Sequence, residues 1–342
     1  MVQMVNIRCV AKKAGVSTGT VSNVLSGNRP VSDKVRSRVL QAIDELGYHP
    51  NMIAHSLITG KSKTIAVVLP GFQLDIDGVL IGIDSALQEK GYSLLVSRLS
   101  AGESPAKHLR SLFSRGIDGV IWSVPETESS RDWVEITKLD PDISIVLAFH
   151  SPLPGYSSIR MDNFSGGYVA TKHLLEHGCR RIGHISGPLR QVEAKERMAG
   201  FERALEEAGL EPVRVYEGDW QISGGVSGMA NMLEQWPDIE AVFASNDRTA
   251  FGVMNTLRRS GRRIPEDVKL IGFDDNLSLD YTNPPLTTIR QEYASMGTRA
   301  VKELFSRIED PNRQPGAQTL PTQLILRQSC GCNHVNTEDP SS

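Results

Sequence analysis

Residues 6–26 read NIRCVAKKAGVSTGTVSNVLS and decide the fold of the N-terminal part of the chain. Asn6 is a favourable helix cap, and apolar residues follow it at positions 7, 10, 11 and 14, the spacing of one helix face. Gly15 ends this helix, because glycine adopts the left-handed backbone of a helix C-terminus at little cost. Ser17 caps a second helix, whose inner face carries Val21, Val24 and Leu25. Two helices joined by so short a turn predict a helix-turn-helix.

The next residues predict a third helix and therefore a small all-α domain over residues 1–50. Residues 27–30, GNRP, form a turn signal, and Ser32 caps a helix that Gly47 ends. The expected buried positions of this helix are Val35, Val39, Ile43 and Leu46. Cys9 stands where an acidic residue would complete the capping box of the first helix, so half of that box is missing.

Charge is distributed unevenly along the 342 residues. Residues 1–63 hold nine basic and three acidic side chains, a net charge of +6, whereas the other 279 residues carry −9. A basic head on an acidic body predicts a polyanion partner, although an uneven solvated surface would give the same numbers. We find no signal peptide and no apolar run near the roughly 18 residues of a membrane span. With only four cysteines, the chain is expected to be cytoplasmic and to have no membrane partner.

The second helix is expected to enter the major groove of DNA with its N-terminal end first. Asparagine can pair with adenine and a threonine methyl can contact thymine, whereas Gly19 offers no side chain to a base. A three-helix bundle without DNA-binding function would show the same helices. Residues 15–19, GVSTG, also fit the G-x-S-x-G pattern of hydrolases, but that pattern needs a preceding strand and a helix precedes it here. The predicted DNA contacts in this part of the chain are Ser17, Thr18, Gly19, Thr20, Ser22, Asn23, Asn28 and Arg29.

The rest of the chain alternates between strand-like apolar runs and amphipathic segments. The expected strands are 65–69, 94–96, 120–123, 143–149, 182–185, 242–244 and 270–273. The expected helices are 76–90, 106–114, 168–177, 197–208, 225–233 and 250–259. Such alternation predicts an α/β architecture with parallel, doubly wound sheets, and about 280 residues suffice for two lobes. Ligands of these folds bind beyond the carboxyl ends of the strands.

Short motifs occur in a dense order along the chain. They are VAKKAGVS at 10–17, TVS at 20–22, VL at 24–25, ELGY at 45–48, HISGP at 184–188, RMAGF at 197–201, SND at 245–247, GFDD at 272–275 and PLTTIRQ at 285–291. Together they resemble the lactose repressor (LacI/GalR) family of bacterial transcriptional regulators over about residues 6–330. The resemblance implies a helix-turn-helix domain followed by a two-lobed periplasmic-binding-protein-like domain. The chain departs from the family pattern at Cys9, Asn23 and His55.

The resemblance also implies domain boundaries. It predicts a hinge helix or linker at 51–63, an effector-binding and dimerisation domain at 64–334 and a polar tail at 335–342. The first lobe would comprise 64–162 and 291–320, and the second lobe 163–290 and 321–334. In the hinge, Ala54, His55 and Leu57 are expected to contact the minor groove, with Leu57 wedged between base steps. A flexible linker is the alternative, since a ten-residue helix is not stable alone in water.

The residues that follow the strands predict an effector site. A sugar needs carboxylate, amide and guanidinium groups for its hydroxyls and an aromatic ring for its apolar face. The expected effector contacts are Phe72, His150, Arg197, Trp220, Asn246 and Asp274, and the resemblance implies Gln291 as a further contact. Alternatives remain for several of them. Arg197 would form only a surface ion pair, Asn246 would cap a helix, Trp220 would serve packing, His150 would be structural and Gln291 would satisfy hinge backbone.

These features predict a ligand-responsive repressor of carbohydrate-utilisation genes. As a homodimer it would bind a palindromic DNA operator in the bacterial nucleoid, and a small sugar-like effector would release it. The alternatives are a corepressor-type regulator with a purine or other metabolite, and a free solute-binding protein. We find no nucleophile–base pair for an enzyme and expect no cofactor. Cys330, Cys332 and His334 alone make a weak metal motif, so no metal is expected either.

Overall fold

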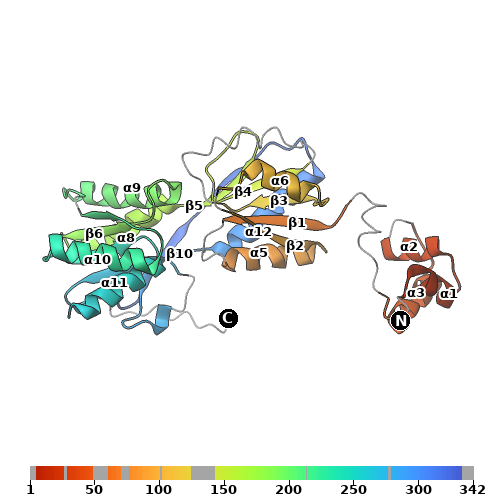
Figure 1. Cartoon of the computed structure of the whole chain (residues 1–342), viewed down its shortest axis with the longest axis horizontal. Coiled ribbons are helices and arrows are strands. Elements are labelled where there is room, and N and C mark those ends of the chain that lie inside the picture. The colour runs from red at the N-terminus through yellow and green to blue at the C-terminus, as the bar shows by residue number, and fades with distance from the viewer. Residues whose placement is uncertain are drawn as a thin grey trace. The chain divides into compact units, whose positions relative to one another are not determined.

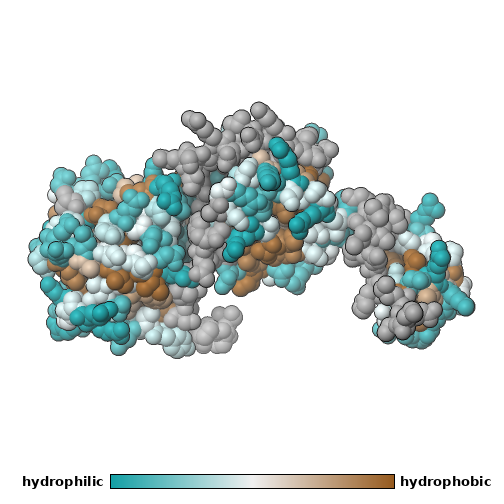
Figure 2. All heavy atoms as spheres, viewed as in Figure 1, coloured by the Kyte–Doolittle hydropathy of each residue, from teal (hydrophilic) through white to brown (hydrophobic). Residues whose placement is uncertain are grey.

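The computed structural model describes residues 5–26, 29–48, 61–70, 77–100, 102–124, 143–212, 214–275 and 279–332. Backbone contacts divide the chain into two compact units, Met1–Lys63 and Thr64–Ser342 (Figure 1). Among the helices in the described ranges, none has the length and apolar character needed to cross a membrane. On the face drawn in Figure 2, apolar residues form small groups among hydrophilic ones.

The first unit contains helices α1 (Ile7–Ala14), α2 (Thr18–Ser26) and α3 (Asp33–Leu46). The expected caps are confirmed at α1, where Asn6 Oδ1 accepts from the backbone N–H of Arg8 at 3.0 Å and Gly15 is left-handed with φ 64°. Ser17 Oγ likewise accepts from the N–H of Thr20 at 3.1 Å and begins α2. Ser32 occupies the cap position of α3, but the expectation that its side chain caps the helix is wrong, because it makes no such hydrogen bond.

The core of the first unit is small and made mainly of valine and alanine. Its fully or nearly fully buried members are Val10, Ala11, Ala14, Val21, Val24, Val39 and Ala42. On α3 the buried positions are Val39 and Ala42, whereas Val35, Ile43 and Leu46 pack only partly buried at the edge. Fewer residues of α3 are therefore fully buried against the other two helices than its sequence predicts.

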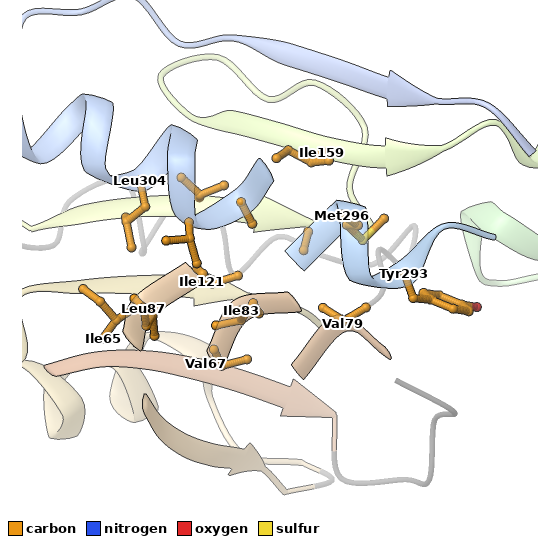
Figure 3. Packing of buried hydrophobic residues seen from close by; sticks show 14 of the residues in the cluster. Ile65, Val67, Val79, Ile83, Leu87, Ile121, Ile159, Tyr293, Met296 and Leu304 are labelled. Carbon is orange, nitrogen blue, oxygen red and sulfur yellow. The ribbon is translucent and has the colours of Figure 1, made fainter. Parts of the chain in front are cut away.

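The second unit contains two six-stranded sheets. The first sheet has the order β11-β5-β4-β3-β1-β2 and is parallel throughout. Its strands are β1 (Thr64–Pro70), β2 (Ser93–Leu99), β3 (Gly119–Trp122), β4 (Ser144–Ala148), β5 (Ser157–Met161) and β11 (Ala317–Leu320). Helices α5 (Asp77–Glu89) and α12 (Tyr293–Glu309) cover one face, where Ile83 and Leu304 pack on Ile121 (Figure 3). Helix α6 (Pro105–Phe113) covers the other face.

The second sheet has the order β12-β10-β9-β8-β6-β7. Its strands are β6 (Ile182–Ser186), β7 (Val215–Glu217), β8 (Ala241–Ala244), β9 (Lys269–Asp274), β10 (Thr287–Gln291) and β12 (Thr322–Ile325), and β12 alone among them pairs antiparallel. Helices α8 (Asn163–Glu176) and α9 (Val192–Glu207) pack on one face, and α10 (Ile222–Gln235) and α11 (Asp247–Arg259) on the other. A short helix, η1 (Leu279–Tyr281), precedes β10. Each sheet with its covering helices forms one layer system. The chain changes from the first layer system to the second after β5, returns to the first after β10 and changes again between β11 and β12.

Neighbouring helices of this unit approach one another at paired glycines. A Cβ added to Gly167 of α8 would lie 2.2 Å from the carbonyl oxygen of Arg197, and one added to Gly200 of α9 would lie 2.2 Å from that of Phe164. The same reciprocal contact occurs between α5 and α12 at Gly82 and Gly297, and between α10 and α11 at Gly225 and Gly252. Only a residue without Cβ permits backbones to approach so closely.

Candidate functional site

Polar residues gather where strands of the second sheet end. Ser186 ends β6, Asn246 lies two residues beyond β8, and Asp274 and Gln291 end β9 and β10. These four strands are mutually parallel, so their carboxyl ends meet at one edge of the sheet. Three of the seven effector residues expected from the sequence, Asn246, Asp274 and Gln291, therefore lie at one edge of the sheet.

Arg197, on α9, is the centre of this group. Its side chain is only 6% exposed, its Nε donates to Asn163 Oδ1 at 2.9 Å and its Nη1 donates to the carbonyl of Ser245. Nη2 lies 3.4 Å from Asp274 Oδ1, and the guanidinium lies 3.7 Å from the centroid of the Phe273 ring. The alternative that Arg197 forms a surface ion pair is wrong, because its partners hold it in the interior.

Asp274 collects hydrogen bonds from both layer systems. Its Oδ1 accepts from Gln291 Nε2 at 2.7 Å and from the hydroxyl of Tyr293 at 3.1 Å, and the Gln291 amide also donates to the Tyr293 oxygen at 2.7 Å. Tyr293 begins α12, whose side chains pack on the first sheet. Burial, and next the charge of Asp274, raise the pKa of Tyr293 well above its ordinary value. A neutral hydroxyl thus links the first layer system to a carboxylate of the second.

A second carboxyl group supports the backbone beside Asp274. Asp247 accepts from the hydroxyl of Thr288 at 2.7 Å and from the N–H of Asp275 at 2.8 Å. Burial, reinforced by the negative charge of Asp274, raises the pKa of Asp247 well above its usual range. Asp274 and Asp275 both have positive φ, 111° and 54°, so Asp247 fixes a backbone turn that L-residues rarely adopt.

Trp220 and Asn246 form the far end of the group. Trp220 Nε1 donates to Gln191 Oε1 at 2.6 Å, and the ring lies so close to Gly187 that a Cβ there would come within 2.2 Å of it. Asn246 caps α11 by accepting from the N–H of Thr249 at 2.8 Å, which confirms the capping interpretation. Its amide group also donates to the Trp220 carbonyl at 3.0 Å, so one side chain positions both the helix and the indole.

The first sheet contributes less to this group. His150, after β4, is 4% exposed, and its Nε2 lies 2.8 Å from the carbonyl of Val124. An ion pair between Arg160 of β5 and Glu196 of α9 joins the two layer systems. Phe72 lies outside the described residues, so its expected contact stays a prediction.

The predicted DNA-contact residues of the first unit lie mostly on its surface. Thr18, Gly19 and Arg29 are exposed, and Thr20, Ser22 and Asn23 are partly so. The Ser17 hydroxyl is engaged, since it lies 2.9 Å from the Thr20 hydroxyl and caps α2. Asn28, Ala54, His55 and Leu57 lie outside the described residues.

Sequence reasoning missed three residues that contact the expected effector residues. Tyr293, Asn163 and Gln191 contact Asp274, Arg197 and Trp220 respectively. Tyr293 carried a weak signal, because it stands two residues after Gln291, the last residue of the motif PLTTIRQ at 285–291. Asn163 belongs to the pair Asp162-Asn163, which also matches the family pattern, whereas Gln191 carried no signal beyond its position before a helix.

His184, on β6 behind this edge, has a strongly perturbed pKa. It is fully buried, its ring stacks on Phe243 with centroids 4.6 Å apart, and its Nδ1 lies 2.9 Å from the Phe243 carbonyl. Burial, which deprives the imidazolium of water, lowers the pKa of His184 to about 4. The side chain is therefore neutral at physiological pH.

Acidification is expected to destabilise the second unit through His184. In the unfolded chain this histidine has a pKa of about 6.5, so it binds a proton at a pH at which His184 of the folded protein is still neutral. The free energy of unfolding should fall as pH drops from about 6.5 to about 4, by on the order of 3 kcal/mol. His184→Gln keeps a donor for the Phe243 carbonyl and does not titrate, so it should flatten this slope in urea unfolding. Equal slopes for the two proteins would contradict the assignment.

Known proteins resemble this chain over nearly its whole length. Residues 6–51 match the family model of bacterial regulatory proteins, lacI family, and residues 171–330 match that of the periplasmic binding protein-like domain. The chain is 34% identical over 331 residues to the HTH-type transcriptional repressor PurR of Pasteurella multocida, and the match covers 95% of this chain and 98% of that protein.

Solved structures show the same architecture. The lac repressor dimer bound to operator and the anti-inducer ONPF matches with a TM-score of 0.86 at 28% identity, covering 96% of this chain and 99% of that one. A complex of the transcriptional regulator CelR with cellobiose matches with a TM-score of 0.71 at 31% identity, covering 95% and 99%. The expected helix-turn-helix unit followed by a two-lobed domain with parallel sheets is confirmed.

Proposed function

Because this chain belongs to the lacI family of bacterial regulatory proteins and is a DNA-binding transcriptional repressor, we propose that the residues around Arg197 and Asp274 bind a small sugar-like effector. The observation that carries this proposal is the buried guanidinium–carboxylate pair at the carboxyl edge of the second sheet, with an indole beside it. The Arg197 guanidinium lies 5.1 Å from the centroid of the Trp220 ring.

The chemistry of this group suits a polyhydroxylated ligand. A sugar hydroxyl both donates and accepts, so it needs a carboxylate and a donor side by side. Asp274 accepts, and Arg197 and Gln291 donate, within one hydrogen-bonded group. Trp220 adds a rigid aromatic surface for the apolar face of a pyranose or furanose ring. The cellobiose complex of CelR is a precedent among similar structures.

Operator binding rests on the first unit. We propose that α2 lies in the major groove with Thr18, Ser22 and Asn23 toward the bases. The basic side chains of the unit would neutralise phosphates, which supplies affinity without sequence preference. Two half-sites of a palindrome require two such helices, so the acting form is a homodimer. Its contacts would draw on large side chains that stay exposed in the monomer: Ile81 at 63%, Val96 at 49% and Tyr281 at 90%.

Effector and operator would be linked through the contacts that join the two layer systems. The Tyr293 hydroxyl on Asp274 and the Arg160–Glu196 ion pair both span them. An effector hydroxyl that donates a hydrogen bond to Asp274 competes with the Tyr293 hydroxyl and so shifts the balance between lobe arrangements. By thermodynamic reciprocity, operator binding must weaken effector affinity by the same factor as effector weakens operator affinity.

A thermal-shift screen against monosaccharides, disaccharides and purines tests the effector proposal. A true effector at about 100 times its Kd should stabilise the protein by roughly 2.7 kcal/mol and raise the Tm by roughly 5–10 °C. Asp274→Asn keeps the shape but removes the charge, and should weaken that effector at least about tenfold.

The matched control is Asp238→Asn, the same change at a 59% exposed carboxylate on the same unit. It should leave the effector shift unaltered. A sugar response that survives Asp274→Asn would place the ligand elsewhere. A response to purines alone would favour a corepressor-type regulator, and operator affinity with and without the purine would then show its direction.

A further inference from the structure

Two histidines and a cysteine meet on the surface of the second unit, away from the effector group. His173 and His177 stand one turn apart on the C-terminal part of α8, with ring centroids 4.5 Å apart. Cys332, from the segment that follows β12, brings its Sγ to 3.4 Å from His177 Nε2 and 3.6 Å from His173 Nε2. The three potential ligand atoms all lie within 4.8 Å of one another.

These separations match the edges of a metal coordination sphere. Zn²⁺ binds imidazole nitrogen at about 2.0–2.1 Å and thiolate sulfur at about 2.3 Å in tetrahedral geometry, which places the two ligand atoms about 3.5 Å apart. Both sulfur–nitrogen distances fall within 0.1 Å of that value, 3.4 and 3.6 Å. Residues four apart on a helix face the same side, so His173 and His177 present their rings together.

We propose that His173, His177 and Cys332 form a binding site for a borderline transition-metal cation, with Zn²⁺ as the representative ion. Imidazole and thiolate are the ligands that such ions prefer over oxygen donors. Three protein ligands leave a fourth position for water or a further donor, as in open zinc sites.

The surroundings allow a cation to enter and to stay. His177 is exposed and His173 and Cys332 are partly exposed, so solvent reaches the cluster. The C-terminus of α8 presents the negative end of its helix dipole beside His177, which is the capping residue. The Cys332 thiol binds a metal ion as the thiolate, so it releases its proton to solvent when the ion binds.

Cys330 does not share this role. It is fully buried, and its sulfur accepts from the hydroxyl of Thr287 at 3.1 Å. The two cysteines therefore differ in their surroundings: the Cys330 thiol lies in the core, whereas the Cys332 thiol lies beside His173 and His177. The sequence alone cannot reveal this, because 155 residues separate His177 from Cys332.

The metal would link the segment that follows β12 to α8. The segment before Cys332 is already tied into the second unit: Arg327 pairs with Asp275 at 2.9 Å, and Ser329 Oγ donates to the Leu270 carbonyl at 2.6 Å. A metal bridge from Cys332 to α8 closes this segment at its far end. Because the unfolded chain lacks a preformed site, metal binding adds to the stability of the folded unit.

Metal titration of the full-length protein tests the proposal. Protein freed of metal with a chelator and kept reduced with a phosphine should bind one Zn²⁺ per chain and gain roughly 5 °C in Tm. Co²⁺ should give the near-ultraviolet charge-transfer absorption of a cobalt–thiolate bond. Cys332→Ser should abolish that absorption, and both Cys332→Ser and His173→Ala should weaken Zn²⁺ at least about tenfold.

Cys9→Ser is the control, because Cys9 is a partly exposed thiol on the other unit. It should bind Zn²⁺ and Co²⁺ as the unaltered protein does. Should Zn²⁺ bind equally well to Cys332→Ser, or should the cobalt absorption follow Cys9 instead, the proposed site would be wrong. Absence of stoichiometric binding to the unaltered protein would overturn it as well.

Discussion

Val21→Asp is expected to abolish operator binding while leaving the effector response of the second unit intact. Val21 has no exposed surface and packs among valines and alanines from all three helices. Burying an unpaired carboxylate there costs several kcal/mol. A unit of 63 residues has little stability to lose. The first unit should therefore unfold, and the second, which forms its own compact body, should not.

The measurement is fluorescence anisotropy with a duplex that the unaltered protein selects from a random library. Leu40→Asp introduces the same charge at a side chain of α3 that is 49% exposed, so it should retain affinity within about tenfold. The unaltered protein should lose roughly 10³-fold in affinity between about 50 and 200 mM salt, because phosphate contacts release counterions. Operator binding by Val21→Asp at the affinity of Leu40→Asp would show that the first unit is not the DNA-binding element.

Local signals made the first unit predictable. Asn6, Ser17 and Gly15 act within two or three residues of themselves, so their roles follow from the sequence. Local signals failed at Ser32, which makes no cap hydrogen bond, and at Ala42, which is buried although it was not expected to be. Both features depend on how α3 packs against the other helices. The central strands of the body were also predictable, since continuous apolar runs such as 65–69 are typical of strands covered on both faces.

The strands that escaped prediction are short and polar. Strand β10 reads TTIRQ and β5 reads SSIRM, which lack the apolar run of a buried strand. Several of their polar side chains are nevertheless buried, and two of these form hydrogen bonds with residues far away in the sequence. Thr288 donates to Asp247, and Ser157 donates to Glu303 at 2.8 Å. Helix α12 differs from these strands, because its apolar side chains recur at helical spacing and its sequence therefore does carry a local signal.

The sequence identified most residues of the polar group around Arg197 and Asp274, but it did not reveal the contacts that join them. Asp274 and Gln291 end strands, and Asn246 and Trp220 lie two or three residues after one. Arg197 was expected at a helix start but lies within α9, which begins at Val192. The grouping of these residues depends on tertiary contacts, such as the bond from Tyr293 of α12 to Asp274. The proposed metal site could not be predicted for the same reason, since its histidines lie at the C-terminal end of α8 and its cysteine lies in the segment that follows β12.

Gly167→Ala is expected to destabilise the second unit by on the order of 3 kcal/mol. In an ordinary helix interior this substitution stabilises by about 1 kcal/mol, so its sign here is diagnostic. The new Cβ would lie 2.2 Å from the carbonyl oxygen and 3.0 Å from the Cα of Arg197, all backbone atoms that no rotamer change can remove. The helices must separate, which moves Arg197 away from Asp274, so the effector-induced rise in Tm should disappear too.

Urea unfolding measures the stability change, with Val169→Ala as the control at a 39% exposed position of the same helix. That variant should unfold like the unaltered protein, within about 0.5 kcal/mol. A protein with Gly167→Ala that is as stable as the control would show that α8 and α9 are not packed at backbone distance.

Gly200→Ala adds a Cβ to the same contact between α8 and α9, but from the α9 side, and so provides a second test of that contact. Its Cβ would lie 2.2 Å from the Phe164 carbonyl oxygen and 2.6 Å from the Tyr168 nitrogen, so it should destabilise about as much as Gly167→Ala. Either substitution alone forces α8 and α9 apart. Once the helices are apart, the Cβ added by the second substitution clashes less, so it causes a smaller further loss of stability. The double variant should therefore lose clearly less stability than the two single losses combined, whereas independent sites add within about 0.5 kcal/mol. Additive losses would mean that each glycine is strained by a separate local contact rather than by one shared helix crossing.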